Sequence, residues 1–166
     1  PRCRTTMNDW RNSAGGVHGW TLFAHPLFLA QVETLARQVE ALKKKDPTGY
    51  TKKNAAKRLA AIRSLAFDLI PQDPTRREYR QGSTLGPGHA HWFRAKFFQQ
   101  YRLYFRYDVR SKVIIYAWVN DETTKRAYDS DVDAYRVFRR MLERGSPPDD
   151  WAALLAEAKQ AAHPAS

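Results

Sequence analysis

The sequence predicts an α+β domain in which an N-terminal helical hairpin packs on an antiparallel sheet of three to four strands, with C-terminal helices and the helices largely on one face. Apolar residues recur at helical spacing between residues 25 and 70, aromatic and β-branched residues dominate residues 92–121, and a helical pattern returns after residue 133. A chain of 166 residues can bury its own core. We therefore expect one domain over residues 20–166, with 133–166 as a C-terminal helical extension and 1–19 as a flexible arm.

The first predicted helix begins at Pro26, because proline is tolerated in the first helical turn. Its last turn contains Lys43–Lys45, which suit the negative end of the helix dipole. A turn at residues 46–49 (DPTG) leads to a second helix from about Lys52 to Ile70. Each helix has one apolar stripe with spacings of three and four residues. The stripes are Phe28, Val32, Leu35, Val39 and Leu42, and Ala55, Leu59, Ile62, Ala66 and Leu69.

Three strands are predicted at about residues 92–98, 101–107 and 113–119. Side chains alternate between the two faces of a strand, which divides the aromatic residues from the cations. One face, expected to be buried, carries Tyr101, Leu103, Phe105 and Tyr107, whereas the other collects Arg94, Lys96, Arg102 and Arg106. Shorter strands are expected at Trp20–Phe23, on a sheet edge, and at Glu78–Arg80.

Two further helices are predicted near the C-terminus. The first covers residues 133–144, and Gly145 and two prolines then prevent its continuation. The second starts after Asp149 or Asp150, either of which suits an N-cap, and runs from Trp151 to about Ala162.

The charge balance indicates a polyanionic partner. Lys and Arg number 28 against 17 Asp and Glu, a net charge of +11, so nucleic acid is the first candidate and an acidic protein the second. The sequence has no apolar run long enough for a transmembrane helix and no signal peptide, which argues against a membrane partner. With Cys3 as the only cysteine, a disulfide framework is excluded and a cytoplasmic location is expected.

The cationic face of the predicted sheet is the main candidate site. Antiparallel sheets often keep one solvated side, but like charges on neighbouring strands repel one another. An anion bound over this face would relieve that repulsion, so we favour an anion site.

A glycine- and proline-rich loop, GSTLGPG, precedes His89 and His91, and it lacks the ending of a phosphate-binding Walker loop. The two histidines could bind a metal, but no third ligand at a suitable spacing is visible. We therefore expect them to be exposed or to face a substrate, and we expect no metal site and no cofactor.

If the anion is RNA, the arginines can hold phosphate oxygens in pairs and stabilise the charge that develops during cleavage. The aromatic residues Trp92, Tyr104 and Trp118 could stack on unpaired bases. Lys125 and Arg126 lie near the end of the sheet and extend the basic surface.

The general acid and base are less defined. The candidates are His89, His91, Asp121, Glu122 and Tyr128. Each has a structural alternative: the histidines could be loop residues without a role, the carboxylates could cap the next helical turn, and the tyrosine could be packed.

Six stretches of the chain carry a resemblance to a known family, in this order: WTLFAHPLF, LKKKDPTGYTKKNAAKRL, YRQGSTLG, FRAKFFQQYRLYFRYD, KVIIYAWVNDETTKRAY and DAYRVFRRMLERGSPPDDW. Together they resemble the YhaV toxin family, within the RelE-like superfamily. The resemblance covers roughly residues 20–151. It implies a microbial RNase fold and the toxin of a type II toxin–antitoxin system, a metal-independent endoribonuclease that cleaves mRNA, on the ribosome or free, and inhibits translation and growth. It further implies a PrlF-like antitoxin with an AbrB-type DNA-binding domain, and operator DNA contacted only through the complex.

Matching positions with RelE-like toxins implies catalytic roles for Arg94 and Lys96 in the R-x-K pair, Arg102 in Y-R-L, and Tyr128. The RelE branch has an arginine just after the apolar strand, where this chain has Asn120, Asp121 and Glu122. This departure allows Asp121 and Glu122 a part in catalysis.

Two other functions remain open. A non-catalytic protein that binds RNA or the ribosome would use the same cationic face, and only a lack of cleavage would distinguish it. A DNA-binding repressor is the weaker alternative, because no helix-turn-helix with a clear recognition helix is present.

Overall fold

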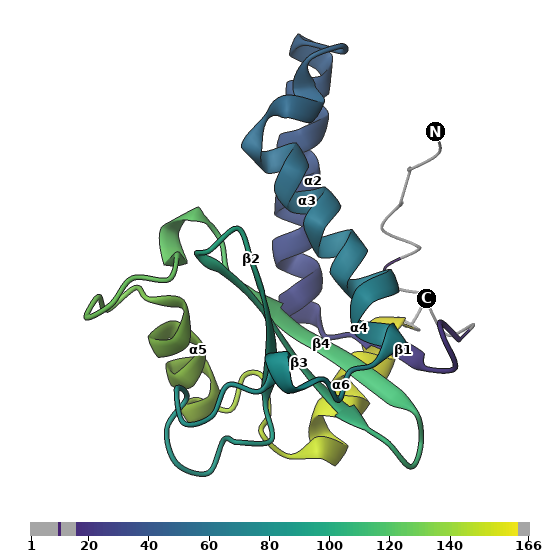
Figure 1. Ribbon diagram of the computed structural model, residues 1–166, viewed down its shortest axis with the longest axis vertical. Coiled ribbons are helices and arrows are strands. Elements are labelled where there is room, and N and C mark those ends of the chain that lie inside the picture. Colours follow the sequence, from purple (N-terminus) through teal and green to yellow (C-terminus); the bar gives the residue numbers. More distant parts are fainter. Residues whose placement is uncertain (1–9, 11–15, 163–166) are drawn as a thin grey trace.

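The computed structural model describes residue 10 and residues 16–162. The order of helices and long strands is the predicted one, and the short edge strand expected at Trp20–Phe23 is confirmed at Thr21–Ala24 (Figure 1). The elements are β1 (Thr21–Ala24), α2 (Pro26–Lys45), α3 (Asn54–Ser64), a π-helical turn (Leu65–Leu69), α4 (Ile70–Gln72), β2 (Phe93–Phe97), β3 (Tyr101–Asp108), β4 (Val113–Val119), α5 (Ala134–Glu143) and α6 (Trp151–Ala162). Short 3-10 turns occupy Tyr50–Lys52, Arg77–Tyr79 and Glu122–Thr124.

The four strands form one sheet in the order β1-β4-β3-β2. The β2–β3 and β3–β4 pairs are antiparallel, but β1 runs parallel to β4, so the expectation of a wholly antiparallel sheet is wrong at this edge. The strand expected at Glu78–Arg80 is also wrong, because the chain forms a 3-10 turn there and only Arg80 bridges to Phe93.

The helical hairpin covers one face of the sheet and projects well beyond it (Figure 1). The apolar stripe of α2 meets the predicted buried face of β3, and Phe28, Val32, Leu103 and Phe105 are fully excluded from solvent. Burial of side chains of this size contributes about 1.5–3 kcal/mol each. The prediction that the hairpin packs on the face of the sheet carrying Leu103 and Phe105 is therefore confirmed.

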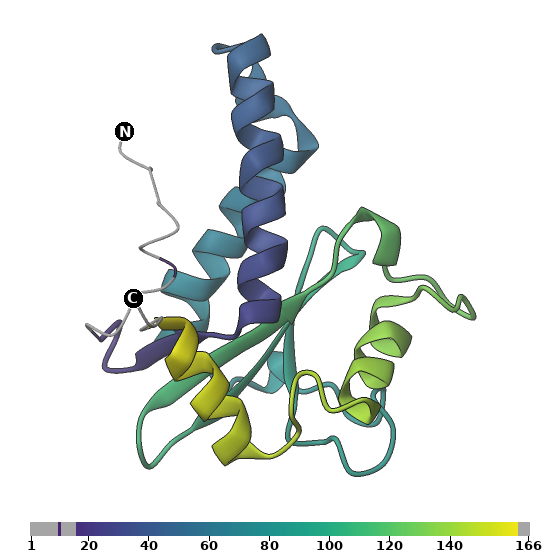
Figure 2. The same cartoon turned by 180° about the vertical axis from the view of Figure 1, so that it is seen from behind.

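The other face of the sheet is covered as well. A second core joins Phe138 and Leu142 of α5 and Leu154 and Ala158 of α6 to that face (Figure 2). The expectation that the helices lie largely on one face is therefore wrong, because the apolar sides of α5 and α6 also need burial and the hairpin side is already occupied.

Most of the predicted flexible arm, residues 1–19, lies outside the described residues. Trp10 is an exception, since its ring is buried and lies 4.7 Å from the ring of Phe67 and 5.6 Å from that of Phe28. Val17 pairs with Trp20 just before β1. At these positions the chain is packed on the domain rather than loose.

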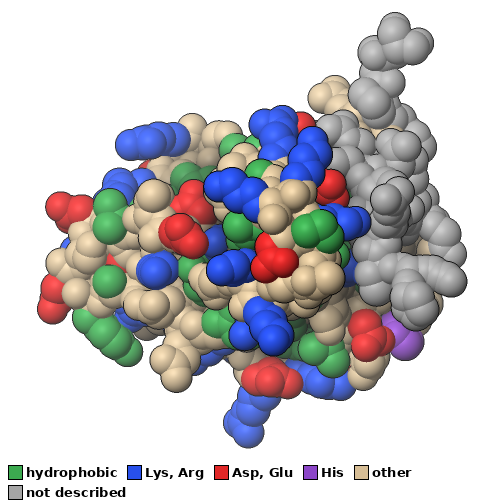
Figure 3. Space-filling model, turned by 90° about the horizontal axis from the view of Figure 1, so that it is seen from above, with side chains coloured by type: hydrophobic (Ala, Val, Ile, Leu, Met, Phe, Trp, Pro, Cys, Tyr) green, Lys and Arg blue, Asp and Glu red, His purple; other side chains and the backbone are tan. Residues whose placement is uncertain are grey.

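On the face seen from above, positive charge is spread out rather than confined to one patch. Figure 3 shows Lys and Arg side chains distributed over the face seen from above, with Asp and Glu between them. None of the helices in the described part of the chain combines the length and the apolar character needed to cross a bilayer.

Candidate functional site

The strand alternation places the predicted cations as expected, on the face opposite the hairpin. Arg94 pairs with Tyr104 across β2 and β3, and Lys96 pairs with Arg102. However, α5 lies over this face, so Arg94 is only 8% exposed and Arg102 only 6%. The cationic face is therefore not an open surface. Only its rim, which includes Lys96, is exposed.

The two buried arginines meet at one hydroxyl group. The hydroxyl of Tyr135, on α5, accepts hydrogen bonds from Nε of Arg94 at 2.8 Å and from Nε of Arg102 at 3.1 Å. Backbone carbonyls hold each Nη1: that of Glu78 for Arg94 (2.7 Å), and those of Gln99 and Tyr101 for Arg102 (2.7 and 2.9 Å). We call Arg94, Arg102 and Tyr135 the arginine–tyrosine cluster.

The cluster leaves one nitrogen of each arginine available. Nη2 of Arg94 and Nη2 of Arg102 make no hydrogen bond or ion pair with any described residue. Neither nitrogen is a fully buried atom without a partner, and since neither has a partner, both reach the surface. Two fixed guanidinium groups thus present free donors, as an oxyanion requires.

The arginines also change the acidity of the tyrosine. Burial by itself would raise the pKa of Tyr135, but the hydrogen bonds and positive charges of Arg94 and Arg102 outweigh burial and lower the pKa.

A buried carboxylate positions the start of α5. Asp133 caps this helix through a hydrogen bond from the Tyr135 N–H at 3.1 Å, and it forms an ion pair with Arg126 at 2.5 Å. The guanidinium of Arg126 in turn lies 5.0 Å from the ring of Tyr135 and 4.0 Å from that of Tyr128. Tyr128 is 84% exposed, so the ring that contacts Arg126 is open to a ligand. Lys125, partly exposed, precedes this group.

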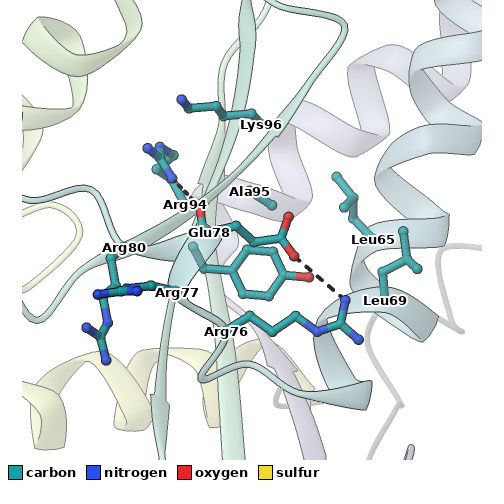
Figure 4. A pocket seen from close by; sticks show the side chains of 10 residues that line it. Leu65, Leu69, Arg76, Arg77, Glu78, Arg80, Arg94, Ala95 and Lys96 are labelled. Carbon is teal, nitrogen blue, oxygen red and sulfur yellow. Dashed lines mark hydrogen bonds and ion pairs between the residues drawn. The ribbon is translucent and has the colours of Figure 1, made fainter.

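A pocket of about 540 Å³ opens beside the cluster and is rich in cations. Figure 4 shows Arg94 and Lys96 on β2 and further arginines on the segment before it. Arg76 pairs with Glu78 at 3.7 Å, the one acidic residue of the lining. We call this the cationic pocket, and its charged lining is Arg76, Arg77, Glu78, Arg80, Arg94 and Lys96.

The expectation that Trp92, Tyr104 and Trp118 stack on bases is wrong for this structure. Trp92 and Tyr104 are fully buried and Trp118 is 6% exposed. All three rings pack on Phe138 of α5, with the ring of Tyr104 stacked at 4.2 Å. They belong to the second core, because α5 occupies the space where bases would lie.

The carboxylates after β4 have structural contacts instead of joining the cluster. Asp121 caps the turn Glu122–Thr124 and also accepts a hydrogen bond from Gln31 of α2 at 3.2 Å. Burial would raise the pKa of Asp121, but its hydrogen bonds from Thr123, Gln31 and Thr124 lower it. Glu122 pairs with Arg58 of α3 at 3.5 Å. Both carboxylates therefore contact the hairpin, and the capping alternative accounts for Asp121.

The two histidines and Arg106 form a separate group. His89 and His91 both contact Asp149, and the backbone carbonyl of Asp149 accepts a hydrogen bond from Arg106 at 2.6 Å. Arg106 lies between the rings of Trp92 and Trp151, at 5.4 and 5.3 Å. The structure therefore does not place these predicted RNA-binding residues in the cluster.

Sequence reasoning missed Tyr135, Asp133 and the arginines at positions 76, 77 and 80. Tyr135 shares an apolar stripe with Phe138, so its spacing indicated only burial. A signal for the arginines was present, since three occur within five residues, but their relation to β2 is tertiary.

Comparison with known proteins identifies the family. A family model described as a toxin with endonuclease activity, of toxin-antitoxin system, matches residues 22–159. The Toxin YhaV of Escherichia coli O6:H1 is 45% identical over 146 residues, and the Ribonuclease toxin YhaV of Escherichia coli K12 is 44% identical. Each alignment covers 87% of this chain and 95% of the relative.

Among solved structures, the toxin-antitoxin complex RelBE2 from Mycobacterium tuberculosis contains a chain 17% identical, with a TM-score of 0.42 over 62% of this chain and 91% of the other.

Proposed function

Because this chain belongs to the YhaV family of toxins with endonuclease activity, we propose that it is an endoribonuclease that cleaves mRNA without a metal ion and thereby inhibits translation and growth. In the proposed reaction the ribose 2′-oxygen bonds to the adjacent phosphorus while the bond from phosphorus to the 5′-oxygen breaks. The 2′-OH loses its proton to a base and the 5′-oxygen gains one from an acid. The products are a 2′,3′-cyclic phosphate and a 5′-hydroxyl.

The observation that carries this proposal is the arginine–tyrosine cluster. Two guanidinium groups are locked by Tyr135 and by backbone carbonyls, and each keeps one nitrogen free at the surface. A phosphorane-like transition state has more negative charge on its oxygens than the ground state, so fixed donors favour the transition state. Tyr135 is a positioning residue in this scheme, because it is only 6% exposed and acts through the two arginines.

The exposed residues at the rim would contact the RNA directly. Lys96 lies opposite Arg102 on the neighbouring strand and lines the cationic pocket, where the next phosphate of the chain could bind. Tyr128 is exposed and lies against Arg126, which suits a proton-transfer group or a ring that stacks on a base. We keep Arg94, Lys96, Arg102 and Tyr128 as catalytic residues and assign Lys125 and Arg126 to RNA binding.

The protein partner is an antitoxin, since the family is that of toxins of toxin–antitoxin systems. We propose a PrlF-like antitoxin with an AbrB-type DNA-binding domain that is acidic where it covers the cationic pocket. Operator DNA would be bound through that complex.

A cleavage assay with purified protein tests the proposal. Wild type, Lys96→Ala and Arg102→Lys are incubated with an mRNA, with and without ribosomes, and the fragments are mapped. We expect cleavage by wild type and reduced cleavage by both variants, and the comparison identifies the target. Binding of RNA or ribosomes without cleavage by wild type would favour the non-catalytic alternative.

A further inference from the structure

We propose that His89, His91 and Asp149 form a binding site for one Zn²⁺ ion, which ties the segment before β2 to the start of α6. The histidines are in the H-x-H sequence, and Asp149 lies 58 residues beyond His91. Among the described residues, these three side chains are the group of histidine, cysteine, aspartate or glutamate side chains that could hold a metal ion, and their ligand atoms lie within 4.8 Å of one another. This inference does not rest on the proposed RNA cleavage.

The distances are close to those of a metal site. Oδ1 of Asp149 lies 3.2 Å from Nδ1 of His89 and 2.9 Å from Nε2 of His91. Ligands held about 2.0–2.2 Å from a tetrahedral zinc ion lie about 3.3 Å from one another. The three ligand atoms all lie within 4.8 Å of one another.

The crowded hydrogen bonding at Asp149 favours a bound metal ion over direct hydrogen bonds from both histidines to the carboxylate. Oδ1 also accepts a hydrogen bond from Nε1 of Trp92 at 2.8 Å, so three nitrogens converge on a single carboxylate oxygen. An oxygen of a carboxylate offers about two lone-pair directions. If a zinc ion took the lone pairs of both imidazoles, the Trp92 hydrogen bond could remain without competition.

The surroundings hold Asp149 in place as second-shell groups do in metal sites. Trp92 is fully buried, and Arg106 fixes the Asp149 backbone carbonyl from its position between Trp92 and Trp151.

Two imidazoles and one carboxylate form a donor set that suits Zn²⁺. The side chains of His89, His91 and Asp149 are 19%, 37% and 40% exposed, so an ion can enter from solvent and a water molecule can take the fourth position. None of its residues belongs to the arginine–tyrosine cluster. We assign the zinc site the role of fixing the segment before β2 against the start of α6.

The test is direct zinc binding by the full chain with Cys3→Ser, which removes its one thiol. ZnCl₂ is titrated into this protein and into the same protein with Asp149→Asn or His91→Gln. The matched control is His18→Gln, because His18 also pairs with an aspartate, Asp68, at 3.2 Å, but without a second histidine. Circular dichroism checks that each variant is folded.

We expect one zinc ion per chain, an increase in Tm with zinc, and affinity weakened at least about tenfold by each of the two site variants, since loss of even a second-shell partner weakens metal binding about 10- to 100-fold. The control should bind like the parent. Absence of zinc binding by the parent, equal binding by a folded site variant, or an equal loss in His18→Gln would overturn the proposal. If Asp149→Asn does not fold, the partly exposed His91→Gln decides the result.

Discussion

Replacing Tyr135 with phenylalanine tests whether the arginine–tyrosine cluster is the functional part of the structure. The change keeps the ring, which packs 6.0 Å from that of Tyr104, and removes only the hydroxyl that Arg94 and Arg102 share. Without it, both guanidinium groups keep their backbone contacts but lose the atom that fixes their relative orientation.

The magnitude follows from the two hydrogen bonds. A hydrogen bond to a charged group contributes about 1.5–3 kcal/mol, so the pair sets an upper limit of about 3–6 kcal/mol. Because each arginine keeps carbonyl partners and reaches water, we expect the free energy of unfolding to fall by about 2 kcal/mol, within the range a folded domain of this size tolerates. Displacement of the free nitrogens by about 1 Å should slow RNA cleavage by about 10²-fold.

A matched control uses the other tyrosine of this region. Tyr104→Phe removes a hydroxyl that is buried and has no hydrogen-bond partner among the described residues. We expect unfolding stability unchanged or higher by about 1 kcal/mol, and cleavage at the wild-type rate. Cleavage rates on a defined mRNA and urea unfolding are measured for both variants. A wild-type cleavage rate in Tyr135→Phe, or an equal loss in Tyr104→Phe, would refute the reasoning.

Three further outcomes are expected. Lys96→Ala should leave the free energy of unfolding within about 0.5 kcal/mol, because the side chain is exposed, yet lower the cleavage rate about tenfold; an unchanged rate would remove Lys96 from the site. Asp133→Ala should lower stability by at least about 3 kcal/mol in urea unfolding, because α5 loses its cap and Arg126 loses a buried partner; a loss below about 1 kcal/mol would contradict this. Since the pKa of Tyr135 is lowered in the folded state, the unfolded chain holds its proton to higher pH, and the stability of wild type relative to Tyr135→Phe should rise as pH increases from the folded pKa to about 10. A difference independent of pH up to 10, in unfolding measurements across that range, would show that the arginines do not lower the pKa.

The sequence predicted much of the fold because the relevant patterns are local. Alternation along β3 assigned Leu103 and Phe105 to the core and Arg102 to the opposite face, as the structure shows. The start of α2 at Pro26 was equally local and is confirmed. Of its predicted stripe, Phe28, Val32 and Leu35 are buried, whereas Val39 and Leu42 are only partly buried. The parallel direction of β1 was not accessible in this way, because it depends on how the hairpin crosses the sheet.

The candidate site was predicted less completely, because its contacts join distant segments. Tyr135 meets Arg102 across 33 positions of the chain, and no local pattern tells a core tyrosine from one that holds two arginines. The same packing of α5 that supplies Tyr135 buries Trp92 and Tyr104, which had been assigned to base stacking. His89 and His91 likewise met their third partner, Asp149, only in the folded chain.

The central claim, attack by the ribose 2′-OH, is tested most directly by an RNA in which the nucleotide before the mapped cleavage site carries a 2′-deoxyribose. The purified protein is incubated in EDTA with this RNA and with the unmodified one, and the ends of the fragments are identified. We predict cleavage of the unmodified RNA to give 5′-hydroxyl and 2′,3′-cyclic phosphate ends, and no cleavage at the deoxy position. Cleavage at that position, or a 5′-phosphate on the product, would contradict the account.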